Sequence, residues 1–231
     1  MADSNGSKIV VTPNGPYLVS GSVPLMVETI GVNAEGGSWT WEPGRSFELK
    51  EKYALCRCGA SATKPYCDGT HAKIAWDAAE TALHTPFAEQ AKTIDGPVMG
   101  LQDAEVLCAF ARFCDNDGTI WQLVTEATGG EKEQTTVHEA VSCPSGRLVL
   151  HRNDTGAAIE PNLAKSISVT EDPAKKSAGP LWVRGGIEVI GQDGKPYEVR
   201  NRQTLCRCGK SANKPFCDGT HVDVDFHDTL G

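Results

Sequence analysis

The sequence predicts an α+β, β-rich fold built from two similar repeats with a different unit between them. Residues 55–71 and 205–221 are identical at 14 of 17 positions, and the match continues upstream in the same register. The upstream segments FELKEKYAL (47–55) and YEVRNRQTL (197–205) both alternate in character, as strands do. This self-similarity indicates that one structural unit occurs twice in the chain.

Each repeat is predicted to contain a strand, a hairpin, a second strand and then a loop rich in cysteine. Residues 15–25 of the first copy resemble residues 179–189 of the second. The first copy then carries an insertion rich in Gly and Trp (31–44), whereas the second closes the same gap with the turn 192–195. The two copies therefore differ in this hairpin.

The segment between the repeats has another pattern, which predicts helices at 103–114 and 135–143 and strands at 119–124 and 147–152. A polar loop is expected at 126–134. This middle segment reads as a small α+β unit. The expected domains are 1–85 for the first repeat, 86–170 for the middle unit and 171–231 for the second repeat.

Composition excludes some classes of function. The net charge of −8 argues against a binder of nucleic acid, which needs a basic surface. No apolar run is long enough to span a bilayer, and the polar start lacks the apolar core of a secretory signal. We therefore expect a cytoplasmic protein. In that reducing compartment, nine cysteines are better explained as metal ligands than as disulfides.

The repeated block has the spacing Cys-x-Cys-x8-Cys-x3-His. Cys56 and Cys58 are two residues apart, so in an extended chain both sulfurs point the same way. Cys67 and His71 are four apart, so in one helical turn both face the same side. Two facing pairs of ligands suit a centre with two metals. The candidate ligands are Cys56, Cys58, Cys67 and His71 in the first repeat, and Cys206, Cys208, Cys217 and His221 in the second.

The blocks CRCGASATKPYCDGTH and CRCGKSANKPFCDGTH resemble the CDGSH iron–sulfur motif of the NEET family, with Thr70 and Thr220 in place of the Ser of the name. The resemblance implies a 2Fe–2S cluster in each repeat, with the first cysteine pair on one iron and the third cysteine and histidine on the other. It also implies a β-rich dimer with two clusters. We therefore expect the two copies to form an intramolecular pseudo-dimer and the chain to be a monomer. We expect no membrane anchor of the kind that the mitochondrial members carry.

Zinc is the alternative occupant, because three cysteines and one histidine are an ordinary zinc ligand set. Zinc sites usually leave two to four residues between paired cysteines. Only one residue separates Cys56 from Cys58. The spacing therefore favours a 2Fe–2S cluster over a zinc-binding interaction module.

Three further cysteines, Cys108, Cys114 and Cys143, lie in the middle unit. Their spacing, with Pro-Ser-Gly after the third, resembles that of single-cluster bacterial ferredoxins, which hold a 3Fe–4S or 4Fe–4S cluster. The residues Ala-Phe-Ala-Arg-Phe between the first two prefer a helix, which would turn Cys108 and Cys114 apart. Two interpretations stay open: a third cluster, or three reduced cysteines packed as small hydrophobes.

The function expected from these features is one-electron transfer. The alternative is an iron–sulfur cluster carrier or a redox or pH sensor, which would need the same ligands. No acid/base pair, phosphate loop or nucleophile arrangement points to a substrate reaction, so we expect no enzymatic activity. The expected partner is a redox protein or an apo-acceptor protein.

Overall fold

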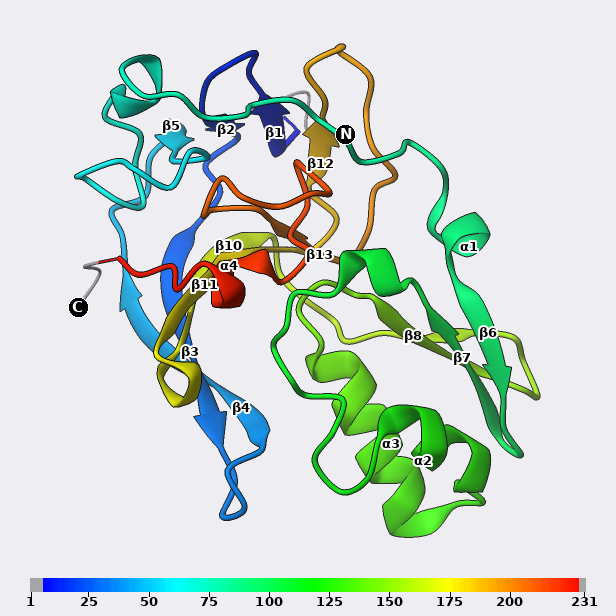
Figure 1. The fold of residues 1–231 in the computed structure, drawn as a ribbon. Helices are drawn as coiled ribbons and strands as arrows, with labels where there is room; N and C mark the ends of the chain where they lie inside the picture. Colours follow the sequence, from blue (N-terminus) through cyan, green and yellow to red (C-terminus); the bar gives the residue numbers. More distant parts are fainter. Residues whose placement is uncertain (1–5, 229–231) are drawn as a thin grey trace.

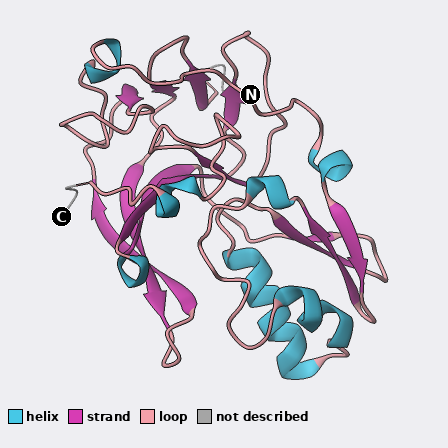
Figure 2. Ribbon diagram, viewed as in Figure 1, coloured by secondary structure: helices cyan, strands magenta, loops and turns pink. Residues whose placement is uncertain are grey.

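The structure, a computed structural model, describes residues 6–228 of the chain, and its strands form three sheets (Figures 1 and 2). The first sheet contains, in spatial order, β12 (Glu188–Ile190), β1 (Lys8–Val11), β2 (Tyr17–Ser20) and β5 (Lys52–Leu55). The second contains β13 (Arg202–Leu205), β11 (Ser177–Arg184), β10 (Ser166–Asp172), β3 (Leu25–Val32) and β4 (Ser38–Ser46). The third contains β6 (Lys92–Asp95), β7 (Met99–Asp103), β8 (Leu148–Arg152) and β9 (Ala158–Ile159). The β-rich α+β fold predicted from the sequence is confirmed.

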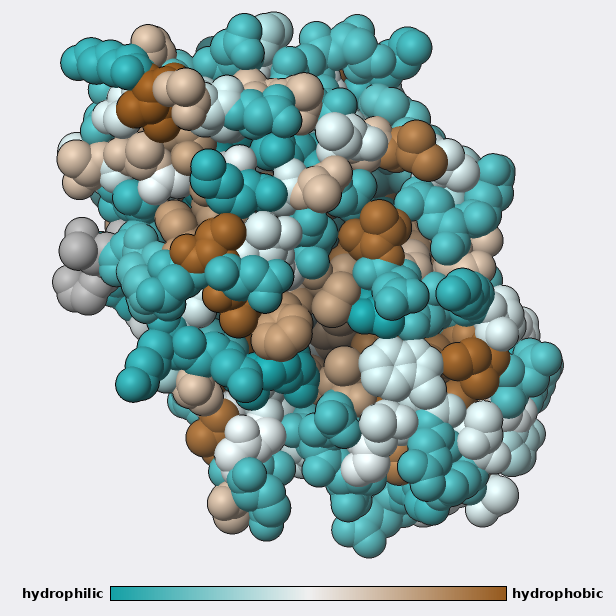
Figure 3. All heavy atoms as spheres, in the orientation of Figure 1, coloured by the Kyte–Doolittle hydropathy of each residue, from teal (hydrophilic) through white to brown (hydrophobic). Residues whose placement is uncertain are grey.

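The helices are short, and the two longest belong to the middle unit. α2 (Ile120–Glu126) and α3 (Gly130–Ser142) pack against the third sheet. The remaining helical turns are η1 (Thr70–Ala72), α1 (Phe87–Gln90), η2 (Glu105–Leu107), η3 (Pro173–Lys175) and α4 (Thr220–Asp223). None of the helices within residues 6–228 is long and apolar enough to cross a bilayer. On the face drawn in Figure 3, hydrophobic residues lie scattered among hydrophilic ones.

Each repeat contributes one strand to the sheet of the other. β3 belongs to the first repeat but pairs in parallel with β10, with Leu25 opposite Ile167. In the same way, β12 of the second repeat pairs in parallel with β1, with Glu188 opposite Lys8. These pairings join strands that are distant in the sequence, so the two copies share one β structure. The predicted intramolecular pseudo-dimer is confirmed, although β10 begins at Ser166, before the domain boundary expected at 170.

A single hydrophobic core is shared by both repeats. Alternate residues of β2 point into it, which is the period of a strand with one buried face. Positions that align in the two copies are buried together, and the aligned pairs are Tyr17 with Leu181, Val19 with Val183, Val23 with Ile187, and Leu55 with Leu205. Residues that align in the sequence repeat therefore occupy equivalent positions in the hydrophobic core.

Residues 119–124, predicted as a strand, instead begin α2. The side chain of Thr119 accepts a hydrogen bond from the N–H of Gln122 and caps this helix. Ile120, Leu123 and Val124 are buried, and their spacing places them on one face of a helix. The polar loop expected at 126–134 is also wrong beyond its first residues, because α3 begins at Gly130. The helix at 135–143 and the strand at 147–152 are confirmed by α3 and β8.

The helix predicted at 103–114 is wrong. After β7 the chain makes the short turn η2, and residues 108–114 form an irregular loop. Phe110 and Arg112 have positive φ angles of 53° and 63°, which no α-helix contains. Arg112 pairs with Asp172 at 2.7 Å, and Phe113 is buried. These tertiary contacts override the helix propensity of residues 108–114.

The insertion at 31–44 lies within the β3–β4 hairpin, which reaches the middle unit. The indole N–H of Trp41 donates a hydrogen bond to the carbonyl of Ser142 at 3.0 Å. The ring of Trp41 stacks on Phe113 with centroids 5.1 Å apart. The hairpin thus touches residues adjacent to two of the middle unit's cysteines.

Candidate metal centres

The first cluster-motif loop follows β5 directly and brings its four candidate ligands into two pairs. The sulfurs of Cys56 and Cys58 lie 3.8 Å apart. The sulfur of Cys67 lies 3.3 Å from Nδ1 of His71. The corresponding distances in the second repeat, for Cys206 with Cys208 and for Cys217 with His221, are 3.7 Å and 3.5 Å.

These distances suit one metal for each pair. Two sulfurs bound to one metal at about 2.3 Å and at the tetrahedral angle lie about 3.8 Å apart, and a sulfur and a nitrogen lie about 3.6 Å apart. Among residues 6–228, no group of three or more His, Cys, Asp or Glu side chains converges on a single ion. The candidate ligands of each repeat lie as two separate pairs, and a centre with two metals remains the prediction from their spacing.

Hydrogen bonds within each loop fix the position of the ligand pairs. The carboxylate of Asp68 accepts from the N–H of Ala62 at 2.8 Å and from the N–H of Thr70 at 2.9 Å. Asp218 makes the same two bonds in the second repeat. The N–H of Gly69 points at the sulfur of Cys67, at 3.4 Å. A thiolate or an anionic cluster at this position gains from such a donor.

One arginine per repeat was missed by the sequence reasoning. Arg57 lies between the paired cysteines and is buried, and its guanidinium donates to the carbonyls of Thr12, Gly15 and Ala78. Among the described residues it forms no ion pair with a carboxylate. Its equivalent, Arg207, pairs with Glu171 and Asp228. The identity of Cys-Arg-Cys in both copies was the available signal.

The two loops lie back to back across the pseudo-two-fold. A Cβ atom on Gly59 would lie 2.4 Å from the carbonyl oxygen of Cys208, and one on Gly209 would lie 2.5 Å from that of Cys58. Both glycines also have positive φ angles, near 79° and 76°. At both positions glycine is therefore required for two reasons, the positive φ angle and the lack of room for a Cβ atom. The contact makes each loop a support for the other.

Comparison with known proteins agrees with this geometry. The profile of the family described as "Iron-binding zinc finger CDGSH type" matches the chain twice, over residues 14–72 and 178–222. The chain therefore contains two CDGSH-type regions in tandem. No curated protein and no solved structure matched it. CDGSH domains bind iron–sulfur clusters, and the ligand pairs described above lie inside the two matched regions.

The two CDGSH centres differ in exposure. Cys67 and His71 are half-buried, whereas Cys217 and His221 are only 3% and 4% exposed. Burial lowers the pKa of His221 to about 4, and the nearby charge of Arg207 acts in the same direction. At neutral pH this imidazole is uncharged, the form in which it can bind a metal.

The three cysteines of the middle unit, Cys108, Cys114 and Cys143, line one cavity together with Arg147. A regular helix at 108–114 would have prevented this arrangement. Burial raises the pKa of Cys114 to about 12, and the neighbouring thiols of Cys143 and Cys108 contribute. The carbonyl of Cys114 accepts the N–H of Ile120 at 3.0 Å, which ties the loop to α2.

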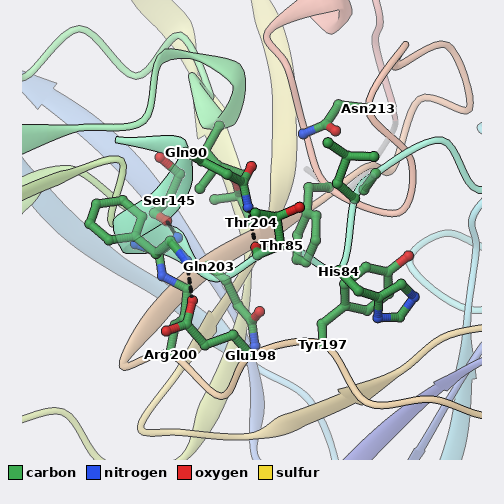
Figure 4. A pocket seen from close by; sticks show the side chains of 15 residues that line it. His84, Thr85, Gln90, Ser145, Tyr197, Glu198, Arg200, Gln203, Thr204 and Asn213 are labelled. Carbon is green, nitrogen blue, oxygen red and sulfur yellow. Dashed lines mark hydrogen bonds between the residues drawn. The ribbon is translucent and has the colours of Figure 1, made fainter. Parts of the chain in front are cut away.

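A second pocket contains none of these cysteines. It lies between residues 82–90, the second CDGSH repeat and the middle unit (Figure 4). His84 stacks on Tyr197 with centroids 4.1 Å apart, and the N–H of Phe87 donates to Glu198 at 2.6 Å. These side chains and backbone groups stack on or hydrogen-bond to each other, so the pocket lies at a packing interface between parts of the chain. His84 has a packing role here.

Proposed function

We propose that this chain holds a 2Fe–2S cluster in each repeat and transfers single electrons. The observation that carries the proposal is the presence of two complete sets of paired ligands, with sulfur–sulfur distances of 3.8 Å and 3.7 Å that each suit one iron. Cys56 with Cys58, and Cys206 with Cys208, would hold one iron of each cluster. Cys67 with His71, and Cys217 with His221, would hold the other.

The bound cluster would supply a couple that accepts and releases one electron. The chain's own residues would tune it through charge. The N–H groups of Gly69 and Gly219 face the sulfurs of the third cysteines, both at 3.4 Å. The buried guanidinium of Arg207 lies close enough to the thiols of Cys208 and Cys56 to interact with the charge of both. Both features stabilise the more negative, reduced state.

Iron and sulfide analysis tests this proposal. Anaerobically purified protein should be coloured and contain at least about four irons and four sulfides per chain, two of each for each 2Fe–2S cluster. Replacing Cys67 by alanine should halve the 2Fe–2S signal, and Cys217→Ala should do the same to the other half. Colourless protein that contains zinc and no sulfide would instead support the interaction module.

Cluster delivery is the second candidate function, and the exposure of the first repeat favours it. Cys67 and His71 are half-buried, so an acceptor could reach this ligand pair. Incubation with an apo-ferredoxin separates the functions, because a carrier passes on iron and sulfide while an electron carrier keeps them. Loss of the cluster from the first repeat alone would identify a carrier.

A third cluster in the middle unit is supported by the convergence of Cys108, Cys114 and Cys143 around one cavity. Arg147 lines the same cavity and pairs with Asp103, so a positive charge lies next to the three thiols. A 3Fe–4S or 4Fe–4S cluster would raise the iron content to about seven or eight per chain. The triple Cys→Ala variant should return it to about four. An unchanged iron content in that variant would contradict a third cluster.

The remaining parts of the proposal concern context. We propose a cytoplasmic monomer with a redox protein or an apo-acceptor as partner, and no binding to nucleic acid or membrane. The net charge of −8 supports the exclusion of nucleic acid. We also propose that the chain catalyses no substrate reaction of its own. A steady-state redox assay with and without an added electron acceptor protein checks the partner class.

A further inference from the structure

The loop 108–114 forms a thin wall between two cavities. The cavity on one side is lined by the three middle-unit cysteines. The cavity on the other side is lined in part by His221 of the second CDGSH centre. Both cavities share Ala109, Phe110, Ala111 and Pro144. One layer of chain therefore separates the two sets of ligands.

The wall touches the second CDGSH loop directly. A Cβ atom on Gly219 would lie 3.3 Å from Cβ of Phe110 and 3.4 Å from the carbonyl oxygen of Cys108. The equivalent residue of the first repeat, Gly69, has nothing within 4 Å of such an atom. The contact is thus specific to the second repeat, although the two motifs are nearly identical in sequence.

Burial agrees with this contact. Cys217 and His221 are almost completely buried, whereas their counterparts Cys67 and His71 are half-buried. The middle unit therefore seals the second centre and leaves the first one open.

We propose that electrons pass inside the chain between the second CDGSH centre and the three-cysteine centre, across the segment Ala109–Ala111. This inference rests on the proposed function, because it needs a cluster at both places. One electron leaves the reduced centre and enters the oxidised one, and no bond or proton changes place. A one-electron donor outside the chain supplies the electron. The first CDGSH centre takes no part in this exchange and faces external partners.

Magnetic relaxation tests the proposal without a measurement of activity. Two reduced clusters separated by one layer of chain should couple, so each shortens the relaxation time of the other. Two variants keep one CDGSH centre each: one carries Cys56→Ala and Cys58→Ala, and the other carries Cys206→Ala and Cys208→Ala. Both are reduced with dithionite and examined by electron paramagnetic resonance. In the first variant the 2Fe–2S signal should be broadened and need several-fold more power to saturate than in the second.

A second pair of variants guards against misfolding. His71→Cys and His221→Cys should keep both clusters bound while shifting the signal of one of them. The shifted signal of His221→Cys should show fast relaxation, and that of His71→Cys should not. Replacing the three middle-unit cysteines by alanine should abolish the difference.

The outcomes separate the inference from the function on which it rests. An iron content near four per chain, with no change in the triple variant, overturns the third cluster and the electron route together. About seven or eight irons with equal relaxation of the two CDGSH signals overturns the route alone. Fast relaxation confined to the first CDGSH centre also overturns it.

Discussion

Replacing Gly59 by alanine should damage both CDGSH centres, although the change lies in the first repeat alone. The added Cβ would lie 2.4 Å from the carbonyl oxygen of Cys208 and 2.8 Å from its carbonyl carbon. Both are backbone atoms of the second repeat, and a backbone cannot move aside as a flexible side chain can. Relief of the clash must push the two loops apart.

The magnitude follows from two separate costs. Alanine at the positive φ angle of Gly59 costs about 1–2 kcal/mol. Overpacking against a fixed backbone costs about 1–3 kcal/mol more. Gly69 provides a matched control, because its φ angle of 85° is similar to the 79° of Gly59 but a Cβ there would meet nothing within 4 Å. Gly69→Ala should therefore pay only the first cost.

The assay is the rate at which the visible absorbance of the clusters is lost on mild heating, with iron measured per chain. Gly59→Ala should lose iron from both repeats and do so faster than Gly69→Ala. Gly209→Ala should behave like Gly59→Ala, because its Cβ would approach Cys58 in the same way. Equal rates for Gly59→Ala and Gly69→Ala would refute the mutual support of the two loops.

Three further predictions address charge, redox potential and assembly. Burial raises the pKa of Glu139 to about 7, so the folded state favours the protonated carboxyl. The free energy of unfolding should therefore fall, by at most about 3 kcal/mol, as the pH rises from about 4.5 to 7. Glu139→Gln should remove this slope in thermal unfolding, whereas Gln in place of the exposed Glu131 should keep it. His71→Cys and His221→Cys should each lower the potential of one cluster, because a thiolate adds negative charge, and a redox titration with both potentials unchanged would exclude histidine ligation. The loaded chain should have a monomeric mass at low micromolar concentration, and cluster loss that tracks dilution would contradict the pseudo-dimer.

The parts of the fold that depend on the repeat could be predicted from the sequence. Aligned positions such as Val19 and Val183 occupy the same core because the comparison was internal to one chain and fixed the register. The exchange of β3 and β12 between the sheets could not be derived in this way. Parallel pairing of strands distant in the sequence leaves no local pattern, and only the resemblance to a dimeric family suggested that the two copies would share a core.

The middle unit was harder to predict because its contacts are not local. The β-branched and aromatic residues of 119–124 suggested a strand, but the spacing of Ile120 and Val124 suits a helix packed on a sheet. Residues 108–114 suggested a helix, but Arg112 pairs with Asp172 of the second sheet and Phe113 stacks on Trp41 of the insertion. Neither partner can be identified from the local sequence.

The ligands were predictable and their inequivalence was not. The two motifs differ at 3 of 17 positions, and none of the three is a ligand, so their chemistry alone predicts two similar centres. In the structure the two centres differ because different parts of the chain cover them. The first repeat leaves Gly69 open, while the middle unit places Phe110 against Gly219. Arg57 keeps its charge without a carboxylate partner among the described residues, while Arg207 is paired with Glu171 and Asp228. A more buried environment disfavours the added negative charge of the reduced state, so the second centre should have the lower potential of the two.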